Sequence, residues 1–393
     1  MQQTHFRQLT TLVILALAAT LAPVSMDMLT PSLAGMSADL QASPQIIELS
    51  LYSFLIGYGI SPSLWGVLSD RMGRRPVMFT GMCLYVLSSL ACAITDDASL
   101  LIGIRLIQGI GAGAGATLAR AVVRDLYGAS GTTRGMARMM SYMAVVPVFM
   151  PVLGGFLSHL MGWQACFVFM SLIGVVSVVA YFFLVPETRP PHGIEGAPKK
   201  ISVIDILRNR IFAQHTVCNM FSISILVIFG ANFAFITGNE FQLDSTANGL
   251  VLALFNGSIA AGTQLVWWLM PRFQAHRSIL IGTAGCALGW LGIALFAHTG
   301  HLSLLQLAPW LIVAGSGSGV IMSLSAGAAL TPFSANTGTA SSVYLLVQSA
   351  GSSAISLGVG WYLPKELVPM TAAMAICACL AMASKVVLSR KVG

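Results

Sequence analysis

The chain has 393 residues, of which 56% are hydrophobic and only 8% are charged, and its mean hydropathy is +0.82. A water-soluble domain carries about 25% charged residues, and one as apolar as this would expose large adhesive patches. The composition therefore excludes an ordinary soluble protein, and the net charge of +7 is better explained by basic cytoplasmic loops of a membrane protein than by nucleic-acid binding.

Apolar runs long enough to cross a bilayer, which takes about 20 residues, recur along the whole chain. They lack the short apolar–polar alternation of barrel strands, so the spans are predicted to be helices, which satisfy their own backbone hydrogen bonds in lipid. The twelve predicted helices are 10–32, 46–69, 75–94, 99–123, 136–159, 163–184, 211–233, 245–269, 276–298, 304–327, 337–362 and 366–388. The predicted fold class is an all-α polytopic membrane protein.

The longest predicted loop, residues 185–210, has the composition of a linker. It is rich in proline and glycine and carries charges of both signs. It divides the chain into an N-terminal six-helix bundle, 1–184, and a C-terminal six-helix bundle, 211–393. Transporters built from paired halves bind substrate at the interface between them.

Lysine and arginine are distributed asymmetrically between the predicted loops. If the N-terminus is cytoplasmic, 18 of the 20 basic residues fall in cytoplasmic segments, which is the positive-inside pattern. Only Lys365 falls outside, and Arg105 lies within a span. This pattern predicts a multi-pass protein of the bacterial inner membrane with both termini in the cytoplasm. Lys385, Arg390 and Lys391 are assigned to the cytoplasmic tail.

The chain shows no arrangement expected of an enzyme or of an ATP-driven pump. No G-x-x-x-x-G-K-[ST] segment is present, and no histidine pair has metal-ligand spacing within a span. A membrane enzyme or scaffold would need a polar catalytic cluster at one depth, and the sequence shows none. We expect a non-enzymatic protein, without metal or cofactor, that acts as a monomer among membrane lipids on a small-molecule substrate.

The loop between the second and third predicted helices concentrates charge and glycine. Gly73 permits a tight turn, while Asp70 can pair with a cation of a neighbouring helix. The loop is either a plain basic anchor or a conformational latch between two states. The latch residues would be Gly66, Asp70, Arg71, Gly73, Arg74 and Arg75.

The same loop resembles, position for position, the G-x-L-[AS]-D-R-x-G-[RK]-[RK] motif of the major facilitator superfamily. Arg105, Gln108 and Gly109 lie in a segment similar to the R-x-x-Q-G-x-G motif of that superfamily. Pro151, Gly154 and Gly155 resemble its antiporter motif G-P-x-x-G-G, although Met150 replaces the first glycine. The resemblance implies the major facilitator fold, with 12 transmembrane helices in two six-helix bundles and alternating access between them.

Within that superfamily, three further segments resemble the bicyclomycin-resistance (Bcr/CflA) type of drug:proton antiporter. They are Met26–Pro31, Arg120–Leu126, and Pro332–Phe333 followed by Gly338–Ser341. The resemblance implies export of small amphipathic drugs or metabolites, with the proton as coupling ion. The alternative is a dedicated exporter of one endogenous metabolite, such as a siderophore.

Two ionisable residues lie at similar depth in the first half. Asp27 is about five residues from the outer end of its helix and Arg105 about six, or roughly 8 Å and 9 Å at the helical rise. Such groups are costly in a membrane and usually pair or face a cavity. If the two are close, Arg105 favours the ionised form of Asp27 and desolvation favours the neutral form. We predict a proton-coupling pair, with a static structural ion pair as the alternative. Glu48, near the outer end of the second predicted helix, is interpreted as an interfacial residue, with a second proton site as the alternative.

The second half has no carboxylate that the sequence places deep in a span. Its polarity within the spans is mainly that of neutral amides, accompanied by aromatic residues. A largely apolar cavity with a few polar groups suits drug-sized ligands. The predicted substrate-cavity residues are Tyr52, Tyr58, Tyr142, Asn232, Phe233, Asn256, Tyr344 and Gln348, and packing between helices is the alternative for each.

Overall fold

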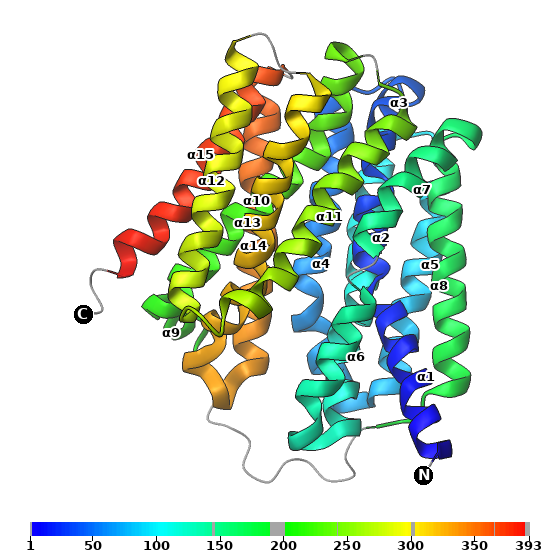
Figure 1. Cartoon of the computed structure of the whole chain (residues 1–393). Helices are drawn as coiled ribbons and strands as arrows, with labels where there is room; N and C mark the ends of the chain where they lie inside the picture. Colours follow the sequence, from blue (N-terminus) through cyan, green and yellow to red (C-terminus); the bar gives the residue numbers. More distant parts are fainter. Residues whose placement is uncertain are drawn as a thin grey trace. The chain divides into compact units, whose positions relative to one another are not determined.

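A computed structural model describes residues 2–143, 146–188, 201–241, 243–299, 303–364 and 366–389. Within these ranges the chain consists of α-helices, two short 3-10 helices and turns, with no β-strand (Figure 1). This confirms the predicted all-α class. The chain divides into two compact units, residues 1–197 and 198–393, and each unit is described by itself. Of the segment 185–210, residues 189–200 lie outside the described residues.

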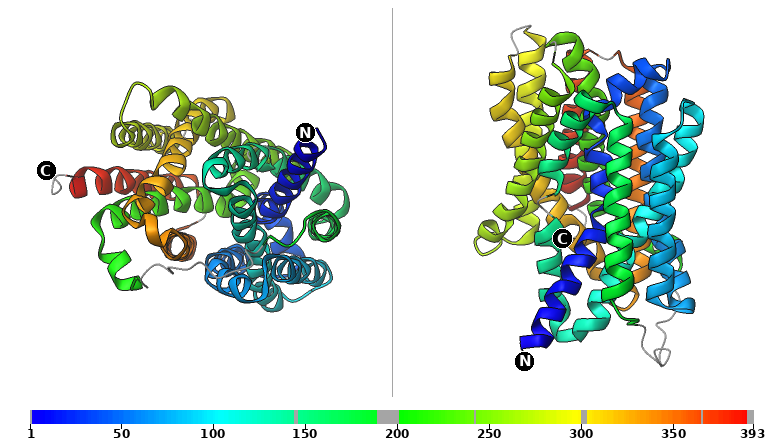
Figure 2. Two further views of the ribbon diagram at one scale, coloured as in Figure 1. Left: turned by 90° about the horizontal axis from the view of Figure 1, so that it is seen from below. Right: turned by 90° about the vertical axis from the view of Figure 1, so that its right-hand side faces the viewer.

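The first unit is built around α6. Its elements are α1 (Gln2–Ala19), α2 (Leu21–Asp27), η1 (Thr30–Ser32), α3 (Leu33–Asp39), α4 (Pro44–Met72), α5 (Arg74–Ala93), α6 (Ala98–Met143), α7 (Val146–Met161) and α8 (Gln164–Leu184). Helix α6 packs against α1, α4 and α5, and α5 lies beside α8 (Figure 2). Gly109 of α6 faces the Phe54 carbonyl of α4, where a Cβ atom would overlap it. Small residues at such crossings let helix backbones approach closely.

The first predicted span is interrupted rather than continuous. Residues Thr10–Ala19 and Leu21–Asp39 meet at an angle of 42°. Proline has no N–H to donate to the carbonyl four residues earlier. Pro23 therefore cannot bond Ala19, where α1 ends, and Pro31 cannot bond Asp27, where α2 ends. The prolines were visible in the sequence, and the break follows from their missing donors.

The fourth and fifth predicted helices are joined in the structure. Helix α6 continues to Met143 as 46 residues of helical hydrogen bonding, through a segment predicted to be a loop. Its membrane-length portion is Ala98–Tyr127, and the next begins at Arg138. Arg120, Arg124 and Asp125 mark the end of the apolar portion. Charge ends an apolar run without ending a helix, because arginine, unlike proline or glycine, has good helix propensity.

The second unit packs around α10. Its elements are α9 (Val203–Arg208), α10 (Arg210–Glu240), α11 (Ser245–Leu269), α12 (Ala275–His298), α13 (Leu304–Leu330), η2 (Thr331–Asn336), α14 (Thr337–Tyr362) and α15 (Leu367–Ser389). Helix α10 contacts α13, α14 and α15. The Phe229 ring lies 4.7 Å from that of Phe255 and 5.7 Å from that of Trp290, centroid to centroid. These aromatic contacts form the centre of the unit's core.

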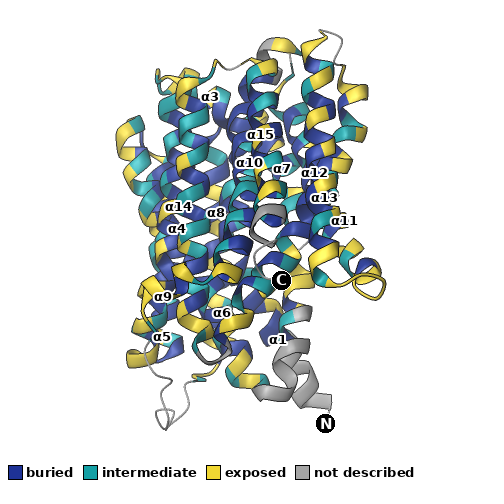
Figure 3. Ribbon diagram, turned by 90° about the vertical axis from the view of Figure 1, so that its left-hand side faces the viewer, coloured by how far each residue is buried: buried dark blue, intermediate teal, exposed yellow. Residues whose placement is uncertain are grey.

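The described helices are suited to a bilayer. Eleven are long and apolar enough to cross a membrane, or up to twelve if the bent pair at the N-terminus is one span. Large apolar side chains such as Phe183, Leu288 and Leu305 are exposed, and exposed positions recur along the helices (Figure 3). Lipid solvates such surface, which water would not.

One predicted tail residue lies elsewhere. Lys385 belongs to α15 and is 0% exposed, so its assignment to the cytoplasmic tail was wrong. The error came from treating a basic residue near the chain end as a solvated one. Arg390 and Lys391 lie outside the described residues.

Candidate functional site

Arg105 lies at the centre of the first unit and is 0% exposed. Its Nε donates to the carbonyl of Ser50 on α4 and its Nη2 to the carbonyl of Ser25 on α2, each at 3.3 Å. The guanidinium also stacks over the Phe54 ring, 4.3 Å from its centroid. Arg105 therefore joins α6 to both α2 and α4.

Gln108 connects the same guanidinium to two further helices. Its Oε1 accepts a hydrogen bond from Arg105 Nη1. Its Nε2 donates to Ser89 Oγ on α5 at 2.7 Å and approaches Met170 Sδ on α8 at 3.9 Å. The predicted helix 4 motif thus forms a buried polar layer. Because a buried charge is costly unless its donors are satisfied, this layer fixes where Arg105 can lie.

The expected direct ion pair between Asp27 and Arg105 is not among the contacts of Arg105. Among the described residues, the polar groups that the Arg105 guanidinium contacts are neutral carbonyls and an amide. Arg105 instead holds the backbone of Ser25, two residues before Asp27. Asp27 is half-buried at the last position of α2. The connection between the two predicted residues passes through the helix backbone.

Helix α7 contacts the segment that carries Asp27. A Cβ atom at Gly154 would overlap the carbonyl oxygen of Met28, so only glycine allows this approach. Cys166 Sγ donates to the Gly154 carbonyl at 3.5 Å. Pro151 and Gly155 of the same motif are buried in α7. The predicted antiporter motif therefore packs directly against the residue that follows Asp27.

Glu48 is a buried carboxyl that the sequence reasoning assigned wrongly. It lies in the second turn of α4 and is 1% exposed, whereas an interfacial residue would be solvated. The Tyr52 hydroxyl, one turn later and 2% exposed, donates to Glu48 Oε2 at 3.3 Å. Its position near a helix end suggested solvent, and only the tertiary packing of the unit buries it.

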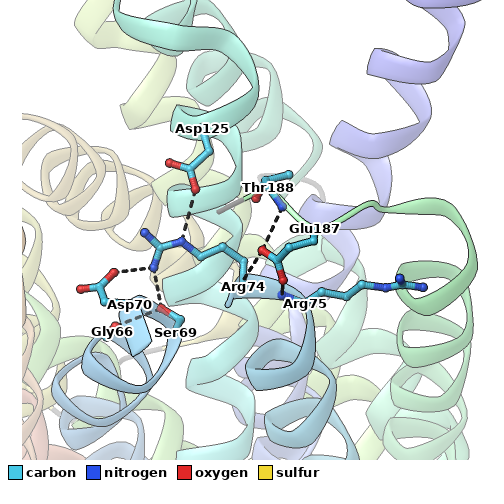
Figure 4. Close-up of polar contacts among 8 residues, drawn as sticks. All are labelled: Gly66, Ser69, Asp70, Arg74, Arg75, Asp125, Glu187 and Thr188. Carbon is cyan, nitrogen blue, oxygen red and sulfur yellow. Dashed lines mark hydrogen bonds and ion pairs between the residues drawn. The ribbon is translucent and has the colours of Figure 1, made fainter. Parts of the chain in front are cut away.

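The predicted latch loop forms a network around Arg74 (Figure 4). Arg74 Nη1 contacts Asp70 Oδ1 at 2.8 Å and donates to Ser69 Oγ at 2.6 Å. Its Nε contacts Asp125 Oδ2 on α6 at 3.2 Å. The Asp70 side chain is 69% exposed and that of Asp125 only 8%. The stronger partner is therefore Asp125, because exposed pairs are screened by water.

A second carboxylate closes the turn at Gly73 (Figure 4). Glu187, just after α8, accepts hydrogen bonds from the backbone N–H groups of Arg74 at 2.9 Å and Arg75 at 3.0 Å. Gly73 has φ +100°, and a Cβ there would lie 2.7 Å from Glu187 Oε2. The carboxylate thus satisfies two free donors at the start of α5, where the helix dipole also favours negative charge. Sequence reasoning missed both Asp125 and Glu187 as members of this network.

The other two predicted latch residues lie beside this network. Arg71 is exposed, and the Gly66 carbonyl accepts a hydrogen bond from Ser69 Oγ at 2.9 Å (Figure 4). The weakly similar loop at 270–277 has no equivalent network among its described contacts: Arg272 bonds the Trp268 carbonyl at 3.0 Å and stacks on the Trp268 ring.

Four predicted cavity residues of the second unit, Tyr344, Gln348, Asn232 and Phe233, have packing contacts within the unit. Asn219 Nδ2 donates to Tyr344 Oη at 2.7 Å and to Gln348 Oε1 at 3.1 Å, which joins α10 to α14. Asn232 donates to the Ile228 carbonyl at 3.0 Å. Phe233 stacks on Phe229 with centroids 4.4 Å apart. Asn232 and Phe233 line a cavity of about 20 Å³, which has room for a water molecule and not for a drug-sized ligand.

The remaining predicted cavity residues are described within their own units, and their role in a substrate cavity stays a prediction. Tyr58 is half-buried on α4, Tyr142 is 39% exposed at the end of α6, and Asn256 is buried on α11. No cluster of three metal-ligating side chains occurs in the part of the chain that the structure describes.

The membrane-length helices of the two units define a polytopic helical membrane protein, with a buried arginine layer and a charged turn between α4 and α5 in its first unit. The model of the Major Facilitator Superfamily matches residues 15–359. The chain therefore belongs to the major facilitator superfamily, and it is a membrane transporter rather than an enzyme.

Relatives and solved structures agree with this assignment. The multidrug resistance protein MdtL of Salmonella dublin and that of Salmonella typhimurium are each 28% identical over 342 residues, covering 84% of this chain and 83% of theirs. The fold is similar to that of the xylose transporter XylE from E. coli, with a TM-score of 0.77, 12% identity and 98% of each chain covered. It is also similar to that of the transporter PepTSo, with a TM-score of 0.76, 13% identity and coverage of 98% of this chain and 97% of that one.

Proposed function

We propose that this transporter exports small amphipathic compounds from the cytoplasm in exchange for protons, by alternating access. The similarity to MdtL, whose name assigns it to multidrug resistance, supports this substrate class. The basic loops favour an inner-membrane location with both termini in the cytoplasm. In this proposal the protein works as a monomer, with the proton as its coupling ion and without a cofactor.

The observation that carries the coupling proposal is the place of Asp27 in the first unit. Asp27 ends α2 where the helix is interrupted, and it is half-buried. Arg105 donates a hydrogen bond to the carbonyl of Ser25, two residues before Asp27. Gly154 packs against the carbonyl of Met28, one residue after it. A change in α6 or α7 therefore acts on the segment that carries the carboxyl group. Moving that group between wetter and drier surroundings changes its affinity for a proton.

The direction of exchange follows from that affinity. Asp27 accepts a proton when the site is open to the outside, which favours release of substrate. It loses the proton when the site is open to the cytoplasm, where the pH is higher. Arg105 contributes a fixed positive charge in the same unit, which favours the ionised form of Asp27. The proton gradient then drives the substrate outward.

The test is transport in proteoliposomes with an imposed pH gradient. Asp27→Asn keeps the size of the side chain and removes its proton chemistry, so uphill export should be lost while substrate binding, measured separately by tryptophan quenching, is retained. Asp96→Asn is the matched control, because Asp96 is an exposed carboxyl in the turn after α5. Uphill export by Asp27→Asn, or wild-type transport that ignores the pH gradient, would refute the proposal.

A further inference from the structure

Basic side chains gather at one end of the second unit, where α10 begins and α15 ends. Helix α15 packs against α10 and α12 there. Lys385 of α15 is 0% exposed, and its Nζ lies 3.4 Å from His215 Nε2 and 3.5 Å from His215 Nδ1 on α10. Gln214 Nε2 donates to the Lys385 carbonyl at 3.0 Å. The backbone of α15 is thus bonded to α10 at the residue whose ammonium group is buried.

The groups around Lys385 offer no negative side chain within this unit. Helix α10 contributes His215 and Cys218, and α12 contributes His276 with Arg277 beside it. In the described part of the unit, none of the acidic side chains contacts Lys385, and all are exposed: Asp205, Glu240, Asp244 and Glu366. A buried ammonium group is normally paired with a carboxylate. Here its neighbour is another base.

Two bases at this distance compete for one proton. Each positive charge disfavours the other, and burial disfavours both. Two positive charges 3.4 Å apart, largely removed from water, cannot persist without a counter-charge. The pair therefore holds one proton or none, and the titration belongs to the pair rather than to either residue.

A proton is the ligand that this arrangement can accept. Lys385 has no exposed surface and His215 is 8% exposed, so the site lacks an opening for a carboxylate or phosphate group. The cavity at Asn232 is not lined by either residue. His276 is exposed and interacts electrostatically with both His215 and Lys385. It can exchange protons with solvent at the edge of the site.

We propose that Lys385 and His215 form a proton-binding site of the second unit, which shares a single proton and exchanges it through the end of the unit where His276 is exposed. The site is distinct from Asp27, which belongs to the other unit. Binding or loss of this proton changes the net charge at the buried contact between α10 and α15 by one unit. The proposal does not depend on which compound is transported.

Proton counting on the full-length protein in detergent tests the site. Potentiometric titration between about pH 5 and about pH 11 covers the ordinary range of imidazole and most of that of a lysine amine. Lys385→Met and His215→Asn should each titrate as many protons as wild type, because the remaining base keeps the shared proton. The double variant should titrate one proton fewer. A loss of two protons in the double variant, or of none, overturns the proposal.

Two further variants guard against unfolding and indirect effects. Lys385→Arg keeps a positive charge that does not titrate in this range, so His215 should stay neutral and the count should fall by one, as in the double variant. His276→Gln should lose one proton in every background, because it is a separate group. All variants are compared as monodisperse, fully helical samples. A Lys385→Arg count equal to that of wild type also contradicts the sharing of one proton.

Discussion

Glu187 accepts a hydrogen bond from the backbone N–H of Arg74 at 2.9 Å, which ties the residues after α8 to the first turn of α5. The same carboxylate accepts from the N–H of Arg75. It therefore acts as a capping group supplied by a distant part of the chain, and the turn at Gly73 depends on it. Local sequence around α5 offers no such cap.

Replacing Glu187 by glutamine should destabilise the first unit modestly. The amide still offers one oxygen acceptor, but it loses the negative charge and one of the two bonds at the helix start. Caps of this kind contribute about 0.5–2 kcal/mol, and we expect a fall of a few degrees in the melting temperature. Thermal unfolding by circular dichroism measures it. Glu366→Gln, at an exposed position, is the control, and an equal effect of both changes would show that the cap contributes nothing.

Arg74 and Asp125 should behave as a coupled pair. Arg74→Met leaves the Asp125 carboxylate, whose side chain is only 8% exposed, without its cation, and losing one partner of a buried pair costs about 3–5 kcal/mol. Adding Asp125→Asn should restore part of that loss. Adding Asp70→Asn to Arg74→Met should restore little of the lost stability, because the Asp70 side chain is largely exposed. Melting temperatures of the single and double variants give the coupling, and purely additive losses with Asp125→Asn would contradict it.

Adding a methyl group at Gly154 should impair transport by displacing Met28. The new Cβ overlaps the Met28 carbonyl, and overpacking of this kind costs about 1–3 kcal/mol. We expect Gly154→Ala to slow export in proteoliposomes more than tenfold, by moving the segment that carries Asp27. Gly103→Ala on α6 is the control, since nothing lies within 4 Å of its Cβ position. Equal transport by both variants would mean that this contact has no functional role.

Glu48 and Asp27 should be separable by isosteric substitution. Glu48→Gln keeps an oxygen acceptor for the Tyr52 hydroxyl, so pH-driven uphill export should persist. The same measurement on Asp27→Asn should show its loss. If Glu48→Gln also abolishes uphill export while downhill transport continues, the buried Glu48 carboxyl shares the proton-coupling role assigned to Asp27.

The sequence predicted the helices well because apolar length and punctuating charge are local signals. Arg105, Gln108 and the charged turn could be chosen from the sequence as candidate site residues, because polar residues within a span and a glycine in a charged turn are rare. The break in the first helix was also accessible, since Pro23 and Pro31 remove known hydrogen-bond donors. It was missed because the apolar run continues across both prolines.

The partners of these residues were not accessible in the same way. Asp125 and Glu187 meet Arg74 only after α6 and α8 have packed against α5. Glu48 and Lys385 both lie near helix ends, where a one-dimensional pattern places solvent, and the tertiary packing of each unit buries them. Whether a residue at a helix end is buried depends on the helices packed around it. A hydropathy profile of the sequence carries no information about those neighbours.

The contact of the Gly154 Cα with the Met28 carbonyl bears on the alternating access proposed above, because it limits any sliding of α7 against the first helix. Because glycine has no side chain, the two backbones can lie close together here, and a small displacement along the helix axis meets little steric resistance. One helical turn, about 5.4 Å, would bring Met150 or Ser158 to the same carbonyl, and neither side chain fits where glycine does. In the proposed alternating access, a shift of α7 by a full turn past Met28 is therefore disfavoured, because Met150 or Ser158 would overlap the carbonyl where Gly154 now fits.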